Sequence, residues 1–511
     1  MRIKYIIKNV NVSLISSVLI TIFNFIARTF FITKLGQEYL GLNSILTNVL
    51  SMLSIAELGI GTAIGFSLYK PLANNDKEKI KSLMNYYKRA YQIIGLIIFV
   101  MGICIIPFLG LFITNMHIFN NIYLIYFLFL INTVYAYFFS YKRTLIIADQ
   151  KNYVLTKYLT TFKIIIYILD IIYLSFGNSF IVYLLIQLIV GIIENIYINY
   201  NINKRYEYIK EKNIQKLDNK ERNLIVKNIK AMFFHKIGDY CVNSTDNLII
   251  AHYISTAIVG IYSNYYTIIY TVNSFLMLIF DSTSASFGNL IAKESKKIIY
   301  EKFKTFNFLA FWLFGWSCIC FYFLLTPFIT TIWLDGNWLI SKAVVLVVVL
   351  NYFFTSMRVP LGIVKTAGGV YNQDKYVPLI QSLVNLVVSI ILVKKIGLLG
   401  VFIGTLASSV LVVFWIRPYI VYKHIFERPL NEYFKIFTKY FISLISIVVV
   451  LEVTFNLFTF SNNIINFIFM ITTIIILPNL VFYIIYRKTN EFGNLLNIAK
   501  GIVGGKFGKK S

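Results

Sequence analysis

Hydrogen-bonding side chains recur at helical spacing inside two apolar stretches of the chain. The members of each series lie three or four residues apart, so each series would occupy one face of a helix. The two series are Asn43, Thr47, Ser51 and Ser54, and Tyr262, Tyr266, Tyr270 and Asn273. Such a face either lines a polar path or joins helices by hydrogen bonds, and the second reading suits bulky tyrosines less well. We predict that both faces border a central cavity.

Charged side chains also lie inside apolar sequence, where lipid makes them costly unless they face a cavity or a partner. Arg28 and Arg358 are candidates for cavity positions, and snorkelling to the headgroups is the alternative for each. Glu57 continues the first polar face, either as a cavity group or as a hydrogen bond between helices. Asp246 is a candidate partner of Arg28, as a structural lock or as an ion-coupling switch. Glu57 is the other candidate for ion coupling.

The remaining reactive side chains give weaker signals. Lys163 and Asp170 lie two turns apart on a similar face, which fits mutual pairing and ligand binding about equally. The four cysteines lie in apolar runs and the four histidines border loops, so we expect no metal site and no disulfide framework. The sequence GIGTAIG has the wrong spacing and context for a dinucleotide site, and no phosphate-binding loop occurs.

The elements that must position these residues are membrane helices. Of the 511 residues, 58% are hydrophobic and 14% are charged, which is far more apolar than a soluble domain. About fourteen runs are long enough to span a bilayer. With fourteen spans, 41 of the 48 Lys and Arg fall on one side and 4 on the other. The positive-inside rule assigns the rich side, with both termini, to the cytoplasm. It also accounts for the net charge of +26 without nucleic acid.

The longest polar stretch divides the runs into six and eight. We expect an N-terminal six-helix bundle, a basic cytoplasmic linker, a C-terminal six-helix bundle, two additional transmembrane helices and a basic amphipathic cytoplasmic tail. The corresponding ranges are 1–202, 203–230, 231–425, 426–490 and 491–511. The tail suggests an interfacial helix on anionic lipid.

An internal repeat relates the two halves. The stretch from Asn24 aligns with the stretch from Asn243 at an offset of 219, which brings Gly41 onto Gly260. The same offset carries the first polar face onto the second. Transporters built from two related halves place their substrate path at the repeat interface. The predicted fold class is therefore an all-α polytopic membrane protein with two pseudo-symmetric six-helix bundles plus two C-terminal helices.

Longer phrases of the sequence resemble a known family. They include LGQEYLGLN, SIAELGIGTAIGFSLYKPLA, KNIKAMFFHKIGDYCVNSTDNLIIAHYIS and SMRVPLGIVKTAGGVYNQDKYVPLIQSLVNLVVSIIL, and they extend to about residue 425. The chain resembles polysaccharide flippases of the MOP transporter superfamily. These are relatives of O-antigen and capsule repeat-unit flippases, lipid II flippases and multidrug MATE exporters.

The resemblance implies a non-enzymatic flippase that moves undecaprenyl-pyrophosphate-linked oligosaccharide repeat units outward by alternating access. It implies the bacterial cytoplasmic membrane, no cofactor, and work beside glycosyltransferases and a polysaccharide polymerase. Proton or Na⁺ coupling is open. The resemblance implies a cationic cavity, in which Arg28 is the favoured candidate for contact with the phosphate. The alternatives are a MATE-like exporter of cations, which would need an acidic cavity, and a membrane-embedded glycan polymerase or glycosyltransferase, which would need a sizeable outer loop.

Overall fold

The computed structural model describes residues 2–57, 60–113, 116–211, 217–218, 222–223, 225–226, 245–370 and 372–503. These residues form helices joined by short turns, and no strand occurs among them. Twelve of the described helical segments are long and apolar enough to cross a membrane. The chain is therefore an all-α, multi-pass membrane protein, as the composition predicted.

The first of the twelve segments holds the first predicted span, 11–33, and the beginning of the second, 40–68. It runs over 43 residues, 11–53, which at about 1.5 Å per residue is roughly twice the thickness of a bilayer core. Inside it, Gly36 leaves the helical conformation with φ 79° and ψ −172°. A side chain would disfavour this backbone geometry, so glycine permits the chain to turn between the two spans. The seventh predicted span, 233–253, lies mostly outside the described residues, and its end is the helix over 245–253.

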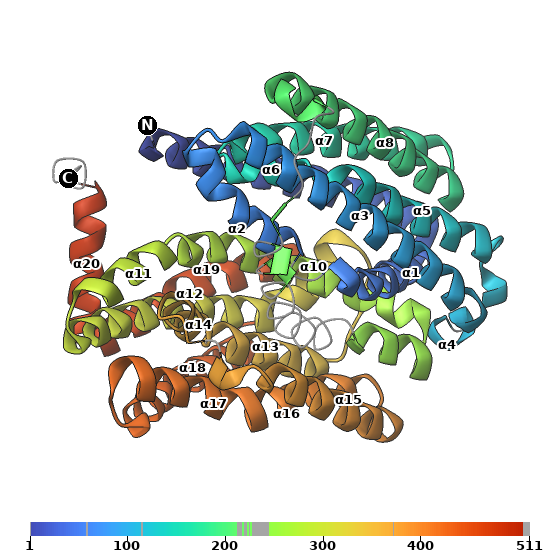
Figure 1. Cartoon of the computed structure of the whole chain (residues 1–511). Helices are drawn as coiled ribbons and strands as arrows, with labels where there is room; N and C mark the ends of the chain where they lie inside the picture. The colour runs from blue at the N-terminus through green and yellow to red at the C-terminus, as the bar shows by residue number, and fades with distance from the viewer. Residues whose placement is uncertain are drawn as a thin grey trace. The chain divides into compact units, whose positions relative to one another are not determined.

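The contacts of the chain divide it into two compact units, residues 1–263 and 264–511. The predicted linker, 203–230, is described only in part, over 203–211, 217–218, 222–223 and 225–226, and the domain boundaries stay a prediction. In unit 1, α3, α5, α7 and α8 run alongside one another, and α1 lies against α7 (Figure 1). The helices of unit 1 are α1 (Arg2–Leu53), α2 (Ile60–Ala73), α3 (Lys77–Ile105), α4 (Leu109–Phe112), α5 (Ile122–Ser140), α6 (Arg143–Ala148), α7 (Asn152–Phe176) and α8 (Phe180–Arg205).

Unit 2 is built on α12, which contacts α13, α14, α18, α19 and α20, while α15 and α16 form a close hairpin. Its helices are α10 (Thr256–Asp281), which begins in unit 1, α11 (Ser284–Lys293), α12 (Lys296–Pro327), α13 (Lys342–Ser356), α14 (Val359–Ala367), α15 (Val377–Ile396), α16 (Leu398–Ser408), α17 (Phe414–Val421), α18 (Leu430–Leu457), α19 (Asn463–Tyr486) and α20 (Asn490–Val503). A π-helical stretch, Ser409–Val413, joins α16 to α17.

The order of elements repeats between the halves. The break between α5 and α6 falls at Tyr141 and Lys142, and the break between α13 and α14 falls at Met357 and Arg358. In each half the broken helix is followed by a helical hairpin, first α7 with α8 and later α15 with α16. Pro360 lies in the first turn of α14, where its missing N–H costs nothing, so it marks the start of that helix.

The two aligned glycines of the repeat meet in space. A Cβ on Gly41 would lie 1.9 Å from the carbonyl oxygen of Thr256, and a Cβ on Gly260 would lie 2.2 Å from that of Gln37. Gln37 and Thr256 are themselves separated by the repeat offset of 219. The contact is therefore reciprocal, as between residues related by a twofold operation. Only glycine lets the two backbones approach this closely.

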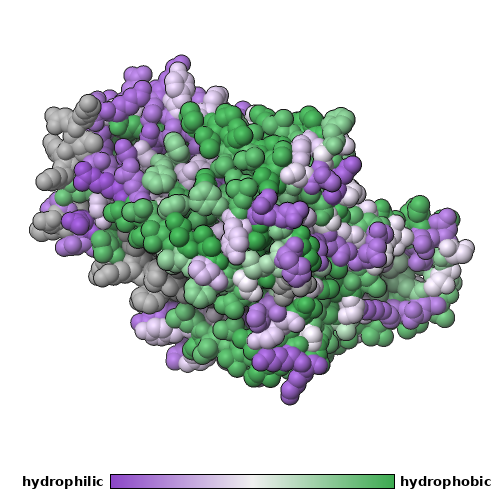
Figure 2. All heavy atoms as spheres, turned by 90° about the vertical axis from the view of Figure 1, so that its right-hand side faces the viewer, coloured by the Kyte–Doolittle hydropathy of each residue, from purple (hydrophilic) through white to green (hydrophobic). Residues whose placement is uncertain are grey.

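The surface carries wide hydrophobic areas, which are drawn green in Figure 2. On α19, large apolar side chains are exposed on successive turns, for example Ile464, Ile468 and Ile475 at 59%, 56% and 52%. A soluble surface rarely exposes apolar patches of this extent. Helices satisfy their own backbone hydrogen bonds, so such a face is stable against lipid.

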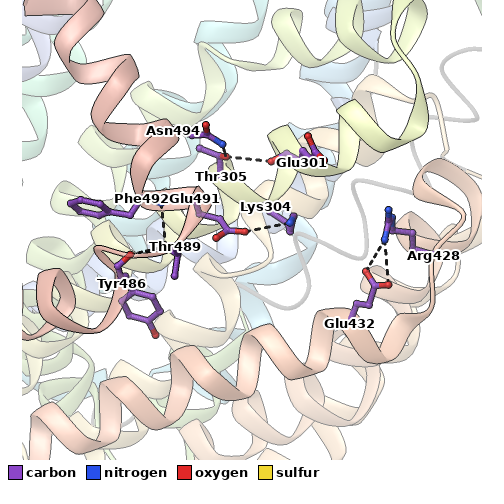
Figure 3. A network of polar contacts seen from close by, with 10 residues as sticks. All are labelled: Glu301, Lys304, Thr305, Arg428, Glu432, Tyr486, Thr489, Glu491, Phe492 and Asn494. Atoms are coloured by element: carbon purple, nitrogen blue, oxygen red, sulfur yellow. Dashed lines mark hydrogen bonds and ion pairs between the residues drawn. The ribbon is translucent and has the colours of Figure 1, made fainter.

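The C-terminal helix α20 is docked on α12. Lys304 on α12 forms an ion pair with Glu491, and Asn494 donates a hydrogen bond of 3.2 Å to the Thr305 hydroxyl (Figure 3). The Phe492 ring stacks on Trp312 with centroids 5.8 Å apart. The predicted tail helix therefore forms over 490–503 and contacts protein on one side, while Leu496 and Ile498 stay exposed.

Candidate functional site

A polar cavity of about 360 Å³ opens inside unit 1 among α1, α5, α7 and α8. Seventeen residues line it, and more than half of them carry a hydrogen-bonding group. The lining is Asn24, Ala27, Arg28, Phe31, Leu40, Asn43, Thr47, Leu50, Ser51, Ser54, Phe129, Asn132, Thr133, Lys163, Tyr167, Tyr183 and Gln187. The first polar series of the sequence thus lies along this cavity, and Arg28 lies with it.

The bend at Gly36 explains how α1 contributes two of its faces to one cavity. Arg28 lies before the bend, and the series from Asn43 to Ser51 lies after it. A straight helix would carry these residues far apart along its axis. The turn folds the second segment back, so the guanidinium and the polar series border the same space.

Arg28 has an anchor on α10. Its Nη2 donates a hydrogen bond of 2.6 Å to the Ser263 hydroxyl, which in turn donates to the carbonyl oxygen of Gly260 at 2.7 Å. The bond ties the side chain to the crossing where Gly41 and Gly260 meet. A guanidinium has five N–H donors in a planar fork, which suits a phosphate. Arg28 therefore lines the cavity, and the hydrogen bond to Ser263 orients its guanidinium group.

The lining is cationic. Two of the seventeen residues, Arg28 and Lys163, carry positive charge, and none carries a carboxylate. The Lys163 ammonium lies 5.1 Å from the centre of the Tyr167 ring. Lys163 also interacts electrostatically with Asp170, which is buried behind the cavity and accepts a weak hydrogen bond from Gln187 at 3.5 Å. Lys163 therefore both lines the cavity, as ligand binding would need, and lies near Asp170, as mutual pairing would need.

Of the two positions that the sequence offered for Glu57, the structure has the hydrogen bond between helices. The α-helix ends at Leu53, and a 3₁₀ turn, Ser54–Glu57, follows. The Tyr91 hydroxyl donates a short hydrogen bond to Glu57 Oε1, and the Tyr87 hydroxyl donates to that of Tyr91 at 3.2 Å. Glu57 is not part of the cavity lining. It lies in a tyrosine-rich network between the end of α1 and α3.

The second polar series lies on α10. Tyr266 and Tyr270 stack with centroids 6.0 Å apart and are 49% and 59% exposed, while Tyr262 and Asn273 are half-buried. Their exposed rings keep a flat apolar face and a hydroxyl available for contact. Asp246 is half-buried in the helix over 245–253. The predicted binding and coupling roles of these residues stay predictions.

Arg358 is buried inside unit 2 and does not reach lipid headgroups by its side chain. It is 5% exposed, and its Nη2 donates to the Thr355 hydroxyl at 3.2 Å. The sequence offered a cavity position and snorkelling to the headgroups as alternatives, and this burial argues against snorkelling. Contact between Arg358 and a substrate stays a prediction.

Sequence reasoning missed several lining residues, among them Tyr167, Tyr183 and Gln187. They lie on α7 and α8, whose apolar patterns do not tell which face meets the polar face of α1. The central position of Lys163 in its span was the one signal available, and it indicated a polar neighbour without identifying a cavity.

Comparisons with known proteins identify the fold. No family model and no curated protein matches the sequence. Among solved structures, the chain is similar to the lipid II flippase MurJ in an inward closed conformation. The TM-score is 0.63 and the identity 16%, over 94% of this chain and 99% of that one. It is also similar to a multidrug resistance MATE family transporter of the MOP superfamily in an inward-facing conformation. There the TM-score is 0.58 and the identity 14%, over 78% of this chain and 94% of that one. The chain therefore has the MOP/MATE-like fold that we expected.

Proposed function

We propose that the protein is a flippase that moves an undecaprenyl-pyrophosphate-linked oligosaccharide repeat unit from the cytoplasmic to the outer leaflet by alternating access. The observation that supports this most directly is the lining of the unit 1 cavity. It contains Arg28, Lys163, and side chains with hydroxyl and amide groups, and it contains no carboxylate. Guanidinium and ammonium groups bind a diphosphate by charge-assisted hydrogen bonds. Hydroxyls and amides bind sugar hydroxyls.

The transport cycle follows from the chemistry of this substrate. A diphosphate cannot enter hydrocarbon unaided, since an isolated charge there is costly. The headgroup would enter the cavity from the cytoplasmic side, and the polyprenyl chain would stay in lipid. Binding shifts the protein between inward-facing and outward-facing states only if the two states bind the headgroup with different free energies. Release outside would supply repeat units to a polysaccharide polymerase, downstream of the glycosyltransferases that assemble them.

Resetting the unloaded carrier would need a proton or Na⁺ gradient, and we place that role on Glu57, with Asp246 as the second candidate. Glu57 fits because it lies between α1 and α2 and accepts the hydrogen bond from Tyr91. No cofactor is needed. The proposed location is the bacterial cytoplasmic membrane with both termini in the cytoplasm.

Two other functions make different demands on the cavity. A MATE-like exporter of organic cations would need carboxylates in the cavity lining. The lining of the unit 1 cavity has cationic side chains instead. A glycan polymerase or glycosyltransferase would need paired acids or a basic cluster on a large outer loop, which the sequence lacks. The cationic lining therefore favours the flippase over the exporter, and the short outer loops predicted from the sequence favour it over the enzyme.

The test is transport by the purified protein in vesicles. Fluorescent undecaprenyl-diphosphate oligosaccharide is placed in the inner leaflet, and its arrival outside is followed by a membrane-impermeant quencher. We expect protein-dependent arrival of intact lipid. Transport of an organic cation but not of this lipid would establish the exporter instead, and a chemically altered glycan would establish an enzyme.

A further inference from the structure

A second group of cationic side chains lies inside unit 2, at the break between α13 and α14. Arg358, at this break, is 5% exposed. Its Nη1 donates to the carbonyl oxygen of Ser409 at 3.4 Å, in addition to the bond to Thr355. Its Nε is buried and has no hydrogen-bond partner. The guanidinium is thus held in place by neutral groups that leave its charge uncompensated.

Arg417, on α17, adds a second positive charge beside it. A Cβ on Gly362 would lie 3.9 Å from Arg417 Nη1, and Gly362 lies one turn after Arg358 on α14. The two guanidinium groups interact electrostatically. The Nε of Arg417 is also buried and without a partner. Two like charges therefore meet over one face of α14.

Two hydroxyl groups complete the arrangement. The Tyr433 side chain on α18 is 1% exposed and interacts electrostatically with both arginines, and its hydroxyl has no hydrogen-bond partner. The Ser409 hydroxyl, on the residue whose carbonyl accepts from Arg358, is buried and also has none. Four buried donors thus have no acceptor. They come from the break before α14, from α17, from α18 and from the π-helical stretch.

The acidic side chains around this corner have other partners. Asp374 pairs with Lys365, Glu427 pairs with Lys296, and Glu432 pairs with Arg428. Among the ion pairs of the described residues, none includes Arg358 or Arg417. A buried charge without a counter-charge destabilises the folded protein. A water molecule could accept hydrogen bonds there but could not neutralise two charges.

We infer that unit 2 binds a small, dehydrated anion of the halide type, such as chloride, between Arg358 and Arg417, with the hydroxyls of Tyr433 and Ser409 as further donors. The anion must be small, because the four donor atoms are buried and almost inaccessible to solvent. A lipid-linked diphosphate would need an open cavity. Because Tyr433 lies on α18, the first of the two helices predicted to follow the second six-helix bundle, the anion would join α18 to the helices that precede it. The site does not depend on the proposed transport function.

The test is the thermal stability of the detergent-purified protein in sodium gluconate, chloride, bromide and phosphate at equal ionic strength. A ligand that binds only the folded state raises the melting temperature as its concentration increases. We expect a saturable rise of a few degrees with chloride and bromide over gluconate. A crystal grown in bromide should show anomalous density between the two guanidinium groups. Equal melting temperatures in all four salts, or a rise with phosphate alone, would overturn the inference.

Substitutions locate the site. Arg417→Gln should abolish the difference between chloride and gluconate, and Arg358→Gln should do the same. The matched control is Arg428→Gln, on the same corner of unit 2, because Arg428 is half-exposed and already paired with Glu432. It should keep the full chloride effect. If the arginine variants do not fold, the bromide density in the wild-type protein decides: its absence from this position contradicts the proposal.

Discussion

At the scale of single residues, the charge of the unit 1 cavity decides what it can bind. Arg28 is oriented by Ser263, and Lys163 projects from another helix into the same space. Two cations with room between them suit a diphosphate better than a single phosphate, because each can bind its own group of oxygens. The roles of the two side chains can be separated by substitution.

Lys163→Met should slow flipping of the lipid-linked oligosaccharide about tenfold. A hydrogen bond to a charged group contributes about 1.5–3 kcal/mol, and about 1.4 kcal/mol corresponds to tenfold. Initial rates in vesicles measure the effect. Lys157→Met is the control, since Lys157 lies on the same helix, is exposed and does not line the cavity. Equal rates for both variants would remove Lys163 from the binding site.

Glu57→Gln should retain transport down a substrate gradient but lose its acceleration by a proton or sodium gradient. The amide keeps the shape and an acceptor for the Tyr91 hydroxyl, whereas it cannot exchange a proton or attract a cation. The measurement is the flipping rate with and without each gradient. Asp246→Asn, assayed in parallel, distinguishes the two coupling candidates. A gradient effect that survives in both variants contradicts the assignment.

At the scale of elements, the broken helices determine which residues come together. The bend at Gly36 brings two faces of α1 to one cavity, and the 3₁₀ turn after Leu53 redirects Glu57 to Tyr91. The crossing of Gly41 over Gly260 then anchors α1 on α10. Each break or crossing depends on a particular short-range feature of the sequence.

Gly41→Ala should destabilise the protein by roughly 1–3 kcal/mol or more, because the methyl group would overlap the Thr256 carbonyl and force α1 and α10 apart. Gly260→Ala should act similarly, owing to the reciprocal contact. Thermal unfolding in detergent measures both. Gly288→Ala is the control, since no atom lies within 4 Å of its added Cβ. If Gly41→Ala or Gly260→Ala is as stable as this control, the backbones of α1 and α10 do not approach this closely.

Phe492→Ala should release α20 from α12. The ring stacks on Trp312, and its centre lies 5.7 Å from that of Tyr483, so the substitution removes both ring contacts. Limited proteolysis after Lys500 should become several times faster. Leu496→Ala removes an exposed side chain of the same helix and should leave the cleavage rate unchanged. Similar rates for the two variants would mean that α20 is held by lipid and not by protein.

At the scale of the whole molecule, the all-helical class and most of the membrane-crossing segments among the described residues could be read from the sequence. Apolar run length and charge asymmetry are global signals that survive local irregularities. The repeat offset even identified two glycines that touch. The faces of α7 and α8 could not be read, because periodicity in an apolar helix does not reveal its neighbour. Glu57 was assigned to the polar face by extending the period of an α-helix, and the 3₁₀ turn Ser54–Glu57 changes that period, so that Ser54 still lines the cavity and Glu57 does not.

The most direct test of the cavity as an anion site is transport by Arg28→Ala in the reconstituted flipping assay, beside Arg28→Lys and the control Arg487→Ala, an exposed arginine outside the cavity. We expect a loss of about tenfold to a hundredfold in the flipping rate for Arg28→Ala. We expect partial recovery with lysine and wild-type rates for Arg487→Ala. Wild-type rates for a folded Arg28→Ala protein would show that the cavity is not the anion site.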